Sequence, residues 1–182
     1  MIKITAKSNN YKKKIKDNHF MGLALEEARL ALKADEFPVG CVIASENELL
    51  VTGSRTGTAG KHPNEIDHAE ITALKRLSIL KKPFEPKVLT LYCTLEPCLM
   101  CFGAILLSNI SRLVYAYEDV MGGATGCDLS LLTPLYQKNT ISIIPDLLRQ
   151  KSLTLFKTYF SDPAINYWKG SLLARYTLEQ KI

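Results

Sequence analysis

The chain has 182 residues, of which 47% are hydrophobic, and its formal net charge is +5. This length suits one compact domain, and a domain of this size buries roughly 70% of the surface of its unfolded chain, so disulfides are not required. No segment approaches the ~20 apolar residues of a membrane span, and the five cysteines form no disulfide framework. A membrane-spanning protein and a disulfide-stapled one are therefore excluded, and we expect a cytoplasmic protein.

The N-terminal part of the chain is basic and is followed by a helical pattern. Residues 1–17 contain six lysines, a composition that can contact RNA but more often marks a solvated, mobile tail. Apolar residues recur at helical spacing over 19–36, and Pro38 ends that pattern. Two short strands at 39–45 and 48–54 then predict an antiparallel hairpin.

The remaining elements alternate between helices and strands. A polar loop follows the hairpin, and the later patterns predict helices at 68–82, 97–108, 129–136, 146–160 and 163–180 and strands at 87–94, 111–117 and 140–144. The order strand, helix, strand indicates a parallel crossover with helices on both faces of a sheet. The sequence therefore predicts an α/β sandwich with mixed strand directions.

Two of these helices begin with residues that can bind metal. One begins at His68 and the other at Pro97-Cys98, with Cys101 sharing a helix face with Cys98. The positive end of a helix lowers the pKa of a cysteine, and the thiolate is the form that binds metal. One imidazole and two thiolates are three ligands of zinc type, and a three-ligand site leaves a position for water. This pattern is typical of catalytic zinc.

Glu70 supplies the second requirement of such a site. Zinc lowers the pKa of bound water from about 15.7 to about 7, but a carboxylate is still needed to move protons. Glu70 lies two residues beyond His68, close enough to serve without being a ligand. The combination of H-x-E with P-C-x-x-C is the signature of zinc deaminases, which attack the amine-bearing carbon of a nucleobase and release ammonia.

The motifs FPVGCVI, HAEITAL, TLEPCLMCFGAILLSNISRLVYAY and GGATG occur in the order and spacing of one known superfamily. The chain resembles the cytidine-deaminase-like superfamily, and within it is most similar to the tRNA-specific adenosine deaminases and the related guanine and cytosine deaminases. The resemblance implies a three-layer α/β/α sandwich with a five-stranded mixed sheet, one Zn²⁺ per chain and a homodimer. It further implies a deaminase domain at 18–160, between the basic tail at 1–17 and a C-terminal helical extension at 161–182.

The same resemblance assigns individual residues. It implies that Glu70 is the proton shuttle and that His68, Cys98 and Cys101 bind zinc. It also implies that Val39, Ala69 and Pro97 line the base pocket. The implied reaction is hydrolytic deamination, with adenosine in tRNA as the leading substrate.

One departure bears on the substrate. The family usually carries an asparagine after the second strand that contacts the bound base or sugar, whereas Arg55 or Thr56 occupies that stretch here. A changed polar contact in a buried pocket alters substrate choice strongly, so a free base or nucleoside of the guanine, cytosine or cytidine type is the alternative. The final segment, 162–182, extends beyond the familiar core and could cover the mouth of the active site or contact a partner.

Other interpretations of the same residues remain open. Asp67 and Glu70 also fit a helix-capping pair, and Cys98 with Cys101 could be a redox pair. His62 could close a purely structural zinc site. A zinc-stabilised domain without activity, which only binds a partner, is the non-enzymatic alternative.

Overall fold

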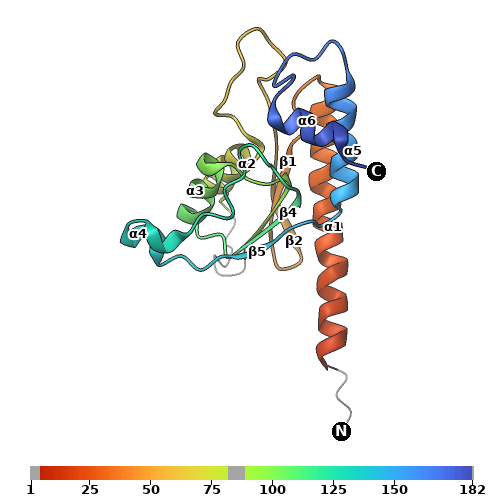
Figure 1. Cartoon of the computed structure of the whole chain (residues 1–182). Coiled ribbons are helices and arrows are strands. Elements are labelled where there is room, and N and C mark those ends of the chain that lie inside the picture. Colours follow the sequence, from red (N-terminus) through yellow and green to blue (C-terminus); the bar gives the residue numbers. More distant parts are fainter. Residues whose placement is uncertain (1–4, 82–88, 182) are drawn as a thin grey trace.

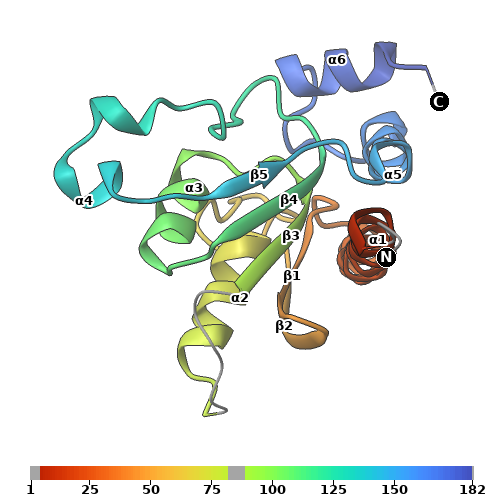
Figure 2. The same cartoon turned by 90° about the horizontal axis from the view of Figure 1, so that it is seen from below.

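The computed structural model describes residues 5–81 and 89–181. A five-stranded sheet forms its centre, with α2 and α3 on one face and α1 and α5 on the other (Figures 1 and 2). The order along the sheet is β2-β1-β3-β4-β5, and the strands are β1 Gly40–Ser45, β2 Glu48–Ser54, β3 Leu89–Leu95, β4 Arg112–Tyr117 and β5 Ser142–Ile144. The predicted three-layer sandwich with a mixed sheet is confirmed.

The strand directions follow from the connections. β1 pairs antiparallel with β2, to which a two-residue turn joins it, and also with β3. β3, β4 and β5 run parallel, because the chain crosses over the sheet between them. β3 and β4 are almost entirely buried on both faces, which explains their nearly continuous apolar sequences.

The helices are α1 Thr5–Lys33, α2 Ala69–Ser78, α3 Leu99–Leu107, α4 Pro134–Gln137, α5 Arg149–Ser161 and α6 Leu172–Glu179, with a short 3₁₀ helix, η2, at Leu129–Leu131. The elements agree with the predicted pattern, although α6 begins nine residues later than the predicted helix. Pro83, expected to end the helix that begins near His68, lies outside the described residues. None of the helices in the described ranges combines the length and apolar character needed to cross a bilayer.

The start of α1 corrects the prediction. The helical pattern was expected from residue 19, but the helix begins at Thr5, so most of the predicted tail is helical. Within this added stretch, the carboxylate of Asp17 accepts hydrogen bonds from the hydroxyl of Tyr92 (2.8 Å) and from both terminal nitrogens of Arg112 (2.8 and 2.6 Å). This buried cluster joins α1 to β3 and β4. The division into segments 1–17, 18–160 and 161–182 stays a prediction.

The C-terminal part of the chain returns to the sheet and to α5. The hydroxyls of Tyr117 in β4 and Thr177 in α6 lie 3.1 Å apart and are both buried. Arg149 of α5 donates to Glu118, which also accepts from the hydroxyl of Tyr176 (2.7 Å). These contacts hold the start of α5 and the middle of α6 to the end of β4, and the segment between the two helices reaches the carboxyl edge of the sheet.

Candidate metal centre and active site

The three predicted metal ligands lie together. His68 immediately precedes α2, Cys98 immediately precedes α3, and Cys101 lies in the first turn of α3. The Nδ1 atom of His68 is 3.6 Å from the sulfur of Cys98 and 3.5 Å from the sulfur of Cys101. The ligand atoms all lie within 4.8 Å of one another, the only such group of His, Cys, Asp or Glu found among the described residues.

Close packing of β2 against α2 brings these atoms together. A Cβ atom on Gly53 would lie 2.2 Å from the carbonyl oxygen of Ala69, so only glycine allows the start of α2 to rest directly on the strand. α3 follows the central strand β3 and packs beside α2. The amino ends of the two helices therefore meet at one edge of the sheet.

The donor set fits zinc. One imidazole nitrogen and two sulfurs are the ligands that zinc prefers, and three protein ligands are the number found in catalytic sites. Hydrogen bonding with Cys101, and then with His68, lowers the pKa of Cys98 to about 4, which outweighs the effect of burial and gives the thiolate required for binding. His62 lies exposed in the preceding loop and does not join the group, so the described residues form no closed four-ligand site.

Glu70 lies beside the three ligands. Its side chain is 3% exposed, and its Oε2 atom has no hydrogen-bond partner among the described residues. Burial raises the pKa of this carboxyl, which makes it a better proton acceptor than an exposed glutamate. The capping alternative is wrong, because the N-cap of α2 is His68, and Asp67 instead contacts Asn64 and Lys75.

A cavity of about 50 Å³ lies next to these groups. Its walls include His68, Glu70 and Cys98 together with the predicted pocket residues Val39 and Ala69. The third predicted pocket residue, Pro97, is buried behind Cys98 and is not part of the cavity wall; its carbonyl accepts the N–H of Ala124 (3.0 Å).

Arg55 also lines the cavity, whereas the neighbouring Thr56 is exposed. The guanidinium is 2% exposed and donates to the carbonyl oxygens of Thr56 (3.1 Å) and Asn64 (2.5 Å). It also reaches the hydroxyl of Tyr167 (3.4 Å), which in turn donates to Glu65 (2.8 Å). Arg55 thus fixes the loop before α2 to the segment between α5 and α6.

Sequence reasoning did not place Tyr167 and Trp168 in the cavity wall. Their rings stack with centroids 5.1 Å apart, and Trp168 has a backbone φ of 54°, a strained value for so bulky a residue. The helix predicted at 163–180 includes both residues, but α6 begins only at Leu172. No local pattern could have corrected this, because the contact is made across more than 100 positions of sequence.

Asp119 was missed as well, although a signal for it exists. It follows β4, and the carboxyl ends of parallel strands meet at the same edge of a sheet, next to Glu96 after β3. The carboxylate of Asp119 accepts the N–H groups of Met121 and Gly122 (both 2.9 Å), while Glu96 accepts those of Asp119 (3.2 Å) and Thr125 (3.1 Å). The two acidic residues hold the glycine-rich loop against the cavity.

Related proteins match this chain in sequence over most of its length. The chain is 32% identical over 146 residues to a tRNA-specific adenosine deaminase of Buchnera aphidicola subsp. Baizongia pistaciae, covering 79% of this chain and 88% of that protein. It is 30% identical over 149 residues to a tRNA-specific adenosine deaminase of Agrobacterium fabrum, covering 81% and 96%.

Solved structures extend this comparison to three dimensions. A structure from a study of A-to-I editing by tRNA:A34 deaminases superposes with a TM-score of 0.61 at 31% identity, covering 75% of this chain and 98% of that one. A guanine deaminase from Nitrosomonas europaea gives 0.60 at 25% identity, covering 78% and 83%. Residues 14–117 match the family described as the cytidine and deoxycytidylate deaminase zinc-binding region. This match spans His68, Glu70, Cys98 and Cys101, and the chain belongs to that deaminase family.

Proposed function

We propose that the protein catalyses the zinc-dependent hydrolytic deamination of a nucleobase. The observation that carries this proposal is the buried carboxylate of Glu70, with one oxygen unpartnered, beside His68, Cys98 and Cys101 at the wall of a cavity. An unpaired buried carboxylate oxygen costs stability, and its retention beside a metal site is explained by a role in proton transfer.

The residues divide the chemical work among them. His68, Cys98 and Cys101 hold zinc, which when bound makes water a stronger nucleophile at neutral pH. Glu70 accepts one proton of the attacking water and gives it to the ring nitrogen, and it then carries the second proton of the water to the amino group, which leaves as ammonia. Val39 and Ala69 contact the base, with Pro97 supporting the wall behind Cys98. Tyr167 and Trp168 cover the cavity and exclude bulk water.

The leading substrate is adenosine in tRNA, with inosine as the product. Relatives named tRNA-specific adenosine deaminases, about 30% identical over most of the chain, support this choice. Such an enzyme has to extrude the target base from the RNA loop into its pocket, and the cavity beside the three metal-binding residues lies at the edge of the sheet.

A free base of the guanine type is the second candidate. Arg55 favours it, because a guanidinium lines the cavity where the family usually carries an asparagine. The structural similarity to a guanine deaminase points in the same direction. When a substrate leaves the polar groups of such a site unpaired, its kcat/KM falls by orders of magnitude.

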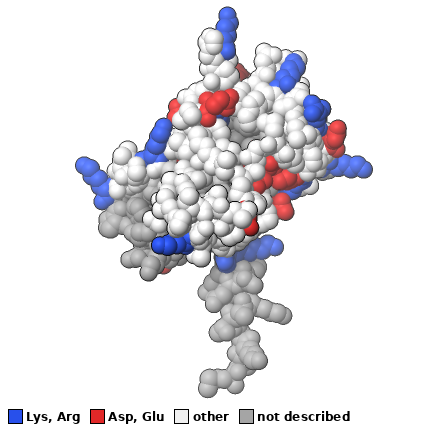
Figure 3. All heavy atoms as spheres, turned by 60° about the vertical axis from the view of Figure 1, so that its left-hand side comes forward, with Lys and Arg blue, Asp and Glu red and all other residues white. Residues whose placement is uncertain are grey.

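We also propose that the protein forms a homodimer in the cytoplasm. Large apolar side chains are exposed on α3 and on η2 with α4, among them Leu99 (68%), Leu131 (81%) and Leu135 (61%). The middle of this side of the molecule carries few charges (Figure 3). Such a surface is typical of a protein interface. The free cysteines fit a reducing compartment.

A substrate panel tests the proposed function. The zinc-loaded protein is offered free bases, nucleosides, nucleotides and an anticodon stem-loop, and ammonia release and product mass are measured. We expect turnover of the stem-loop with a mass gain of about 1 Da, the replacement of an amino group by oxygen. Turnover of small molecules alone would contradict the tRNA assignment, and no turnover of any substrate would contradict the deaminase.

A further inference from the structure

Two buried cysteines lie side by side beneath the candidate active site. Cys41 in β1 and Cys93 in β3 are direct partners in the antiparallel register of the two strands. Both side chains are 0% exposed, and neither forms a disulfide. They belong to the same core cluster as Ala69, the first residue of α2, so they face the side of the sheet on which α2 packs. Neither is among the three side chains that lie together as candidate metal ligands.

Glu70 lies against this pair of thiols. It follows Ala69 in the first turn of α2, and its buried carboxylate has the thiol of Cys93 as a hydrogen-bonding neighbour. The thiols of Cys41 and Cys93 in turn hydrogen-bond with each other. The three side chains therefore form a row that leads from the middle of the sheet to the cavity, whose wall includes Glu70 but neither cysteine.

Both thiols are in the form that can donate a hydrogen bond. Burial raises the pKa of Cys41 and raises that of Cys93 well above its ordinary value, so each thiol keeps its proton at neutral pH. A thiol is a weak donor to a neutral group, but a hydrogen bond to a carboxylate is charge-assisted and therefore stronger. Cys93 thus donates to Glu70, and Cys41 donates to the sulfur of Cys93.

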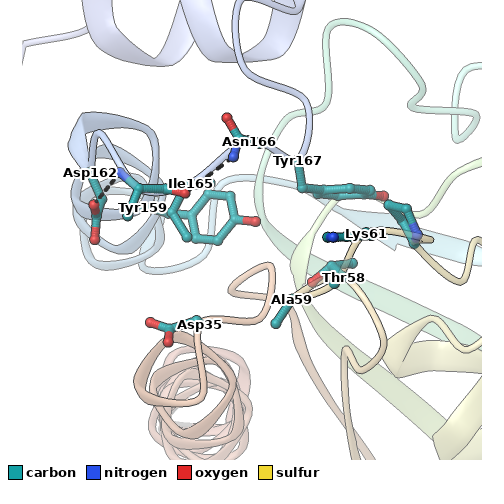
Figure 4. Close-up of a pocket in the computed structure, with 12 residues that line it drawn as sticks. Asp35, Thr58, Ala59, Lys61, Tyr159, Asp162, Ile165, Asn166 and Tyr167 are labelled. Atoms are coloured by element: carbon teal, nitrogen blue, oxygen red, sulfur yellow. Dashed lines mark hydrogen bonds between the residues drawn. The ribbon is translucent and has the colours of Figure 1, made fainter.

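The polar groups on the opposite side of the cavity are directed to other partners. The guanidinium of Arg55 donates to two backbone carbonyls of the loop before α2, and the hydroxyl of Tyr167 donates to Glu65 (2.8 Å). Tyr167 also lines a second hollow, of about 600 Å³, whose walls include the loop at 58–63 (Figure 4). These side chains close the cavity, but the orientation of Glu70 is set from the side of the sheet.

We propose that Cys93 is a positioning residue for Glu70 and that Cys41 orients the thiol of Cys93. This inference rests on the proposed function, because Glu70 transfers protons only if the protein is a deaminase. The hydrogen bond from Cys93 restricts the rotation of the carboxylate, while the Oε2 atom, which has no partner among the described residues, stays available to the attacking water. Such positioning matters because a misplacement of 1 Å can cost about 10²-fold in rate.

Two replacements of similar size separate this role from simple packing. Cys93→Ala and Cys93→Ser both remove the large sulfur atom, but serine keeps a hydrogen-bond donor. Ammonia release by the zinc-loaded protein is measured with an anticodon stem-loop, or with guanine if guanine is the base that it deaminates. We expect the kcat of Cys93→Ala to fall about 3- to 10-fold, the effect of one lost hydrogen bond, with little change in KM. Cys93→Ser should keep about half of the kcat or more.

The stability of the two variants should not follow the order of their activity. A buried hydroxyl is more costly to desolvate than a methyl group, so Cys93→Ser should unfold at no higher a urea concentration than Cys93→Ala. If Cys93 only filled space, the less stable variant would not be the more active one. Zinc content is measured on the same preparations and should be equal in both, because neither change removes a ligand.

Ile43→Val is the matched control for a loss of core volume. Ile43 is 0% exposed and pairs with Leu91, the next pair of the same two strands on the same face of the sheet. Removal of its methyl group should lower the urea midpoint and leave kcat unchanged.

Infrared spectroscopy detects the contact without turnover. The S–H stretching band of Cys93 is obtained as the difference between the unaltered protein and Cys93→Ala. A hydrogen bond to a carboxylate lowers the frequency of this band, so Glu70→Gln, which offers a weaker acceptor, should raise it. The band of Cys127, an exposed cysteine in the glycine-rich loop, is obtained in the same way from Cys127→Ala and should not respond to Glu70→Gln.

The outcomes distinguish this inference from the proposed function. If the unaltered protein deaminates its substrate but Cys93→Ala keeps the full kcat, or if the Cys93 band does not respond to Glu70→Gln, Cys93 does not position Glu70 and the deaminase remains. If the unaltered protein deaminates no substrate, the proposed function fails and the positioning role fails with it.

Discussion

Among single residues, Glu70 is the one on which the chemistry depends. Replacing Glu70 with Gln keeps its shape but removes the group that accepts a proton, so turnover should fall by about 10²–10⁴-fold or more. Its carboxyl is buried and has a raised pKa, so the neutral amide should not destabilise the fold. Ammonia release and zinc content are measured on the same preparation. A variant that holds zinc and retains full activity would show that Glu70 is not the proton shuttle.

Arg55 has a positioning role that can also be measured. Its buried guanidinium joins the carbonyl of Asn64 to the hydroxyl of Tyr167, and lysine cannot reproduce these divergent hydrogen bonds. Arg55→Lys should therefore lower the free energy of unfolding by about 1–3 kcal/mol in urea titrations. Arg29→Ala, which removes an exposed ion pair with Glu26, is the control and should cost at most about 0.5 kcal/mol. Equal effects of the two changes would contradict the assigned role of Arg55.

At the level of elements, the contact between β2 and α2 sets the position of the metal site. A side chain at Gly53 would collide with the backbone of Ala69 and with Ala73, whose nitrogen would lie 2.8 Å away. Gly53→Ala should therefore cost about 1–3 kcal/mol and weaken zinc binding, because α2 carries Glu70 and begins at His68.

The control for this change lies in another helix. Gly22 in α1 has open space where a Cβ would be added, so Gly22→Ala should raise stability by about 0.5–1 kcal/mol. Unfolding curves and zinc titrations of the two variants are compared. Unchanged zinc affinity in Gly53→Ala would show that the strand does not position the site.

The hydrogen bonds between Glu36 and the loop at 57–59 should make the free energy of unfolding depend on pH in the acid range. Burial opposes ionisation of Glu36, but hydrogen bonds from Thr58, Gly57 and Ala59 outweigh it and lower its pKa. Because its pKa is lowered by folding, Glu36 contributes fully to stability at pH values above its unfolded-state pKa of about 4.3. This contribution is lost as the pH falls through the pKa of the folded state. Glu36→Gln should therefore cost about 1 kcal/mol at pH 7 and much less near pH 3. The same cost at both pH values would contradict the assignment.

At the scale of the whole molecule, the sequence was sufficient to predict most of the fold and the residues that lie together at the candidate metal site. The helical and strand periodicities are local, and His68, Glu70, Cys98 and Cys101 belong to two compact motifs at helix starts. Such signals need no knowledge of distant contacts.

The features that were missed depend on tertiary contacts. Asp17, in the part of α1 that was predicted to be a tail, contacts Arg112 and Tyr92, which lie 75 or more positions away. Tyr167 and Trp168 reach the cavity only because α5 and α6 anchor the segment between them. Sequence periodicity carries no information about such long-range contacts, so these residues could not be placed before the structure was known.

The most direct test of the central claim is the X-ray absorption spectrum of zinc in the purified protein. Convergence of His68, Cys98 and Cys101 on one ion predicts one zinc per chain with one nitrogen, two sulfurs and one further oxygen ligand, and Cys101→Ala should lose one sulfur or the metal itself. A zinc enclosed by four nitrogen or sulfur ligands, or a folded protein that binds no zinc, would contradict it.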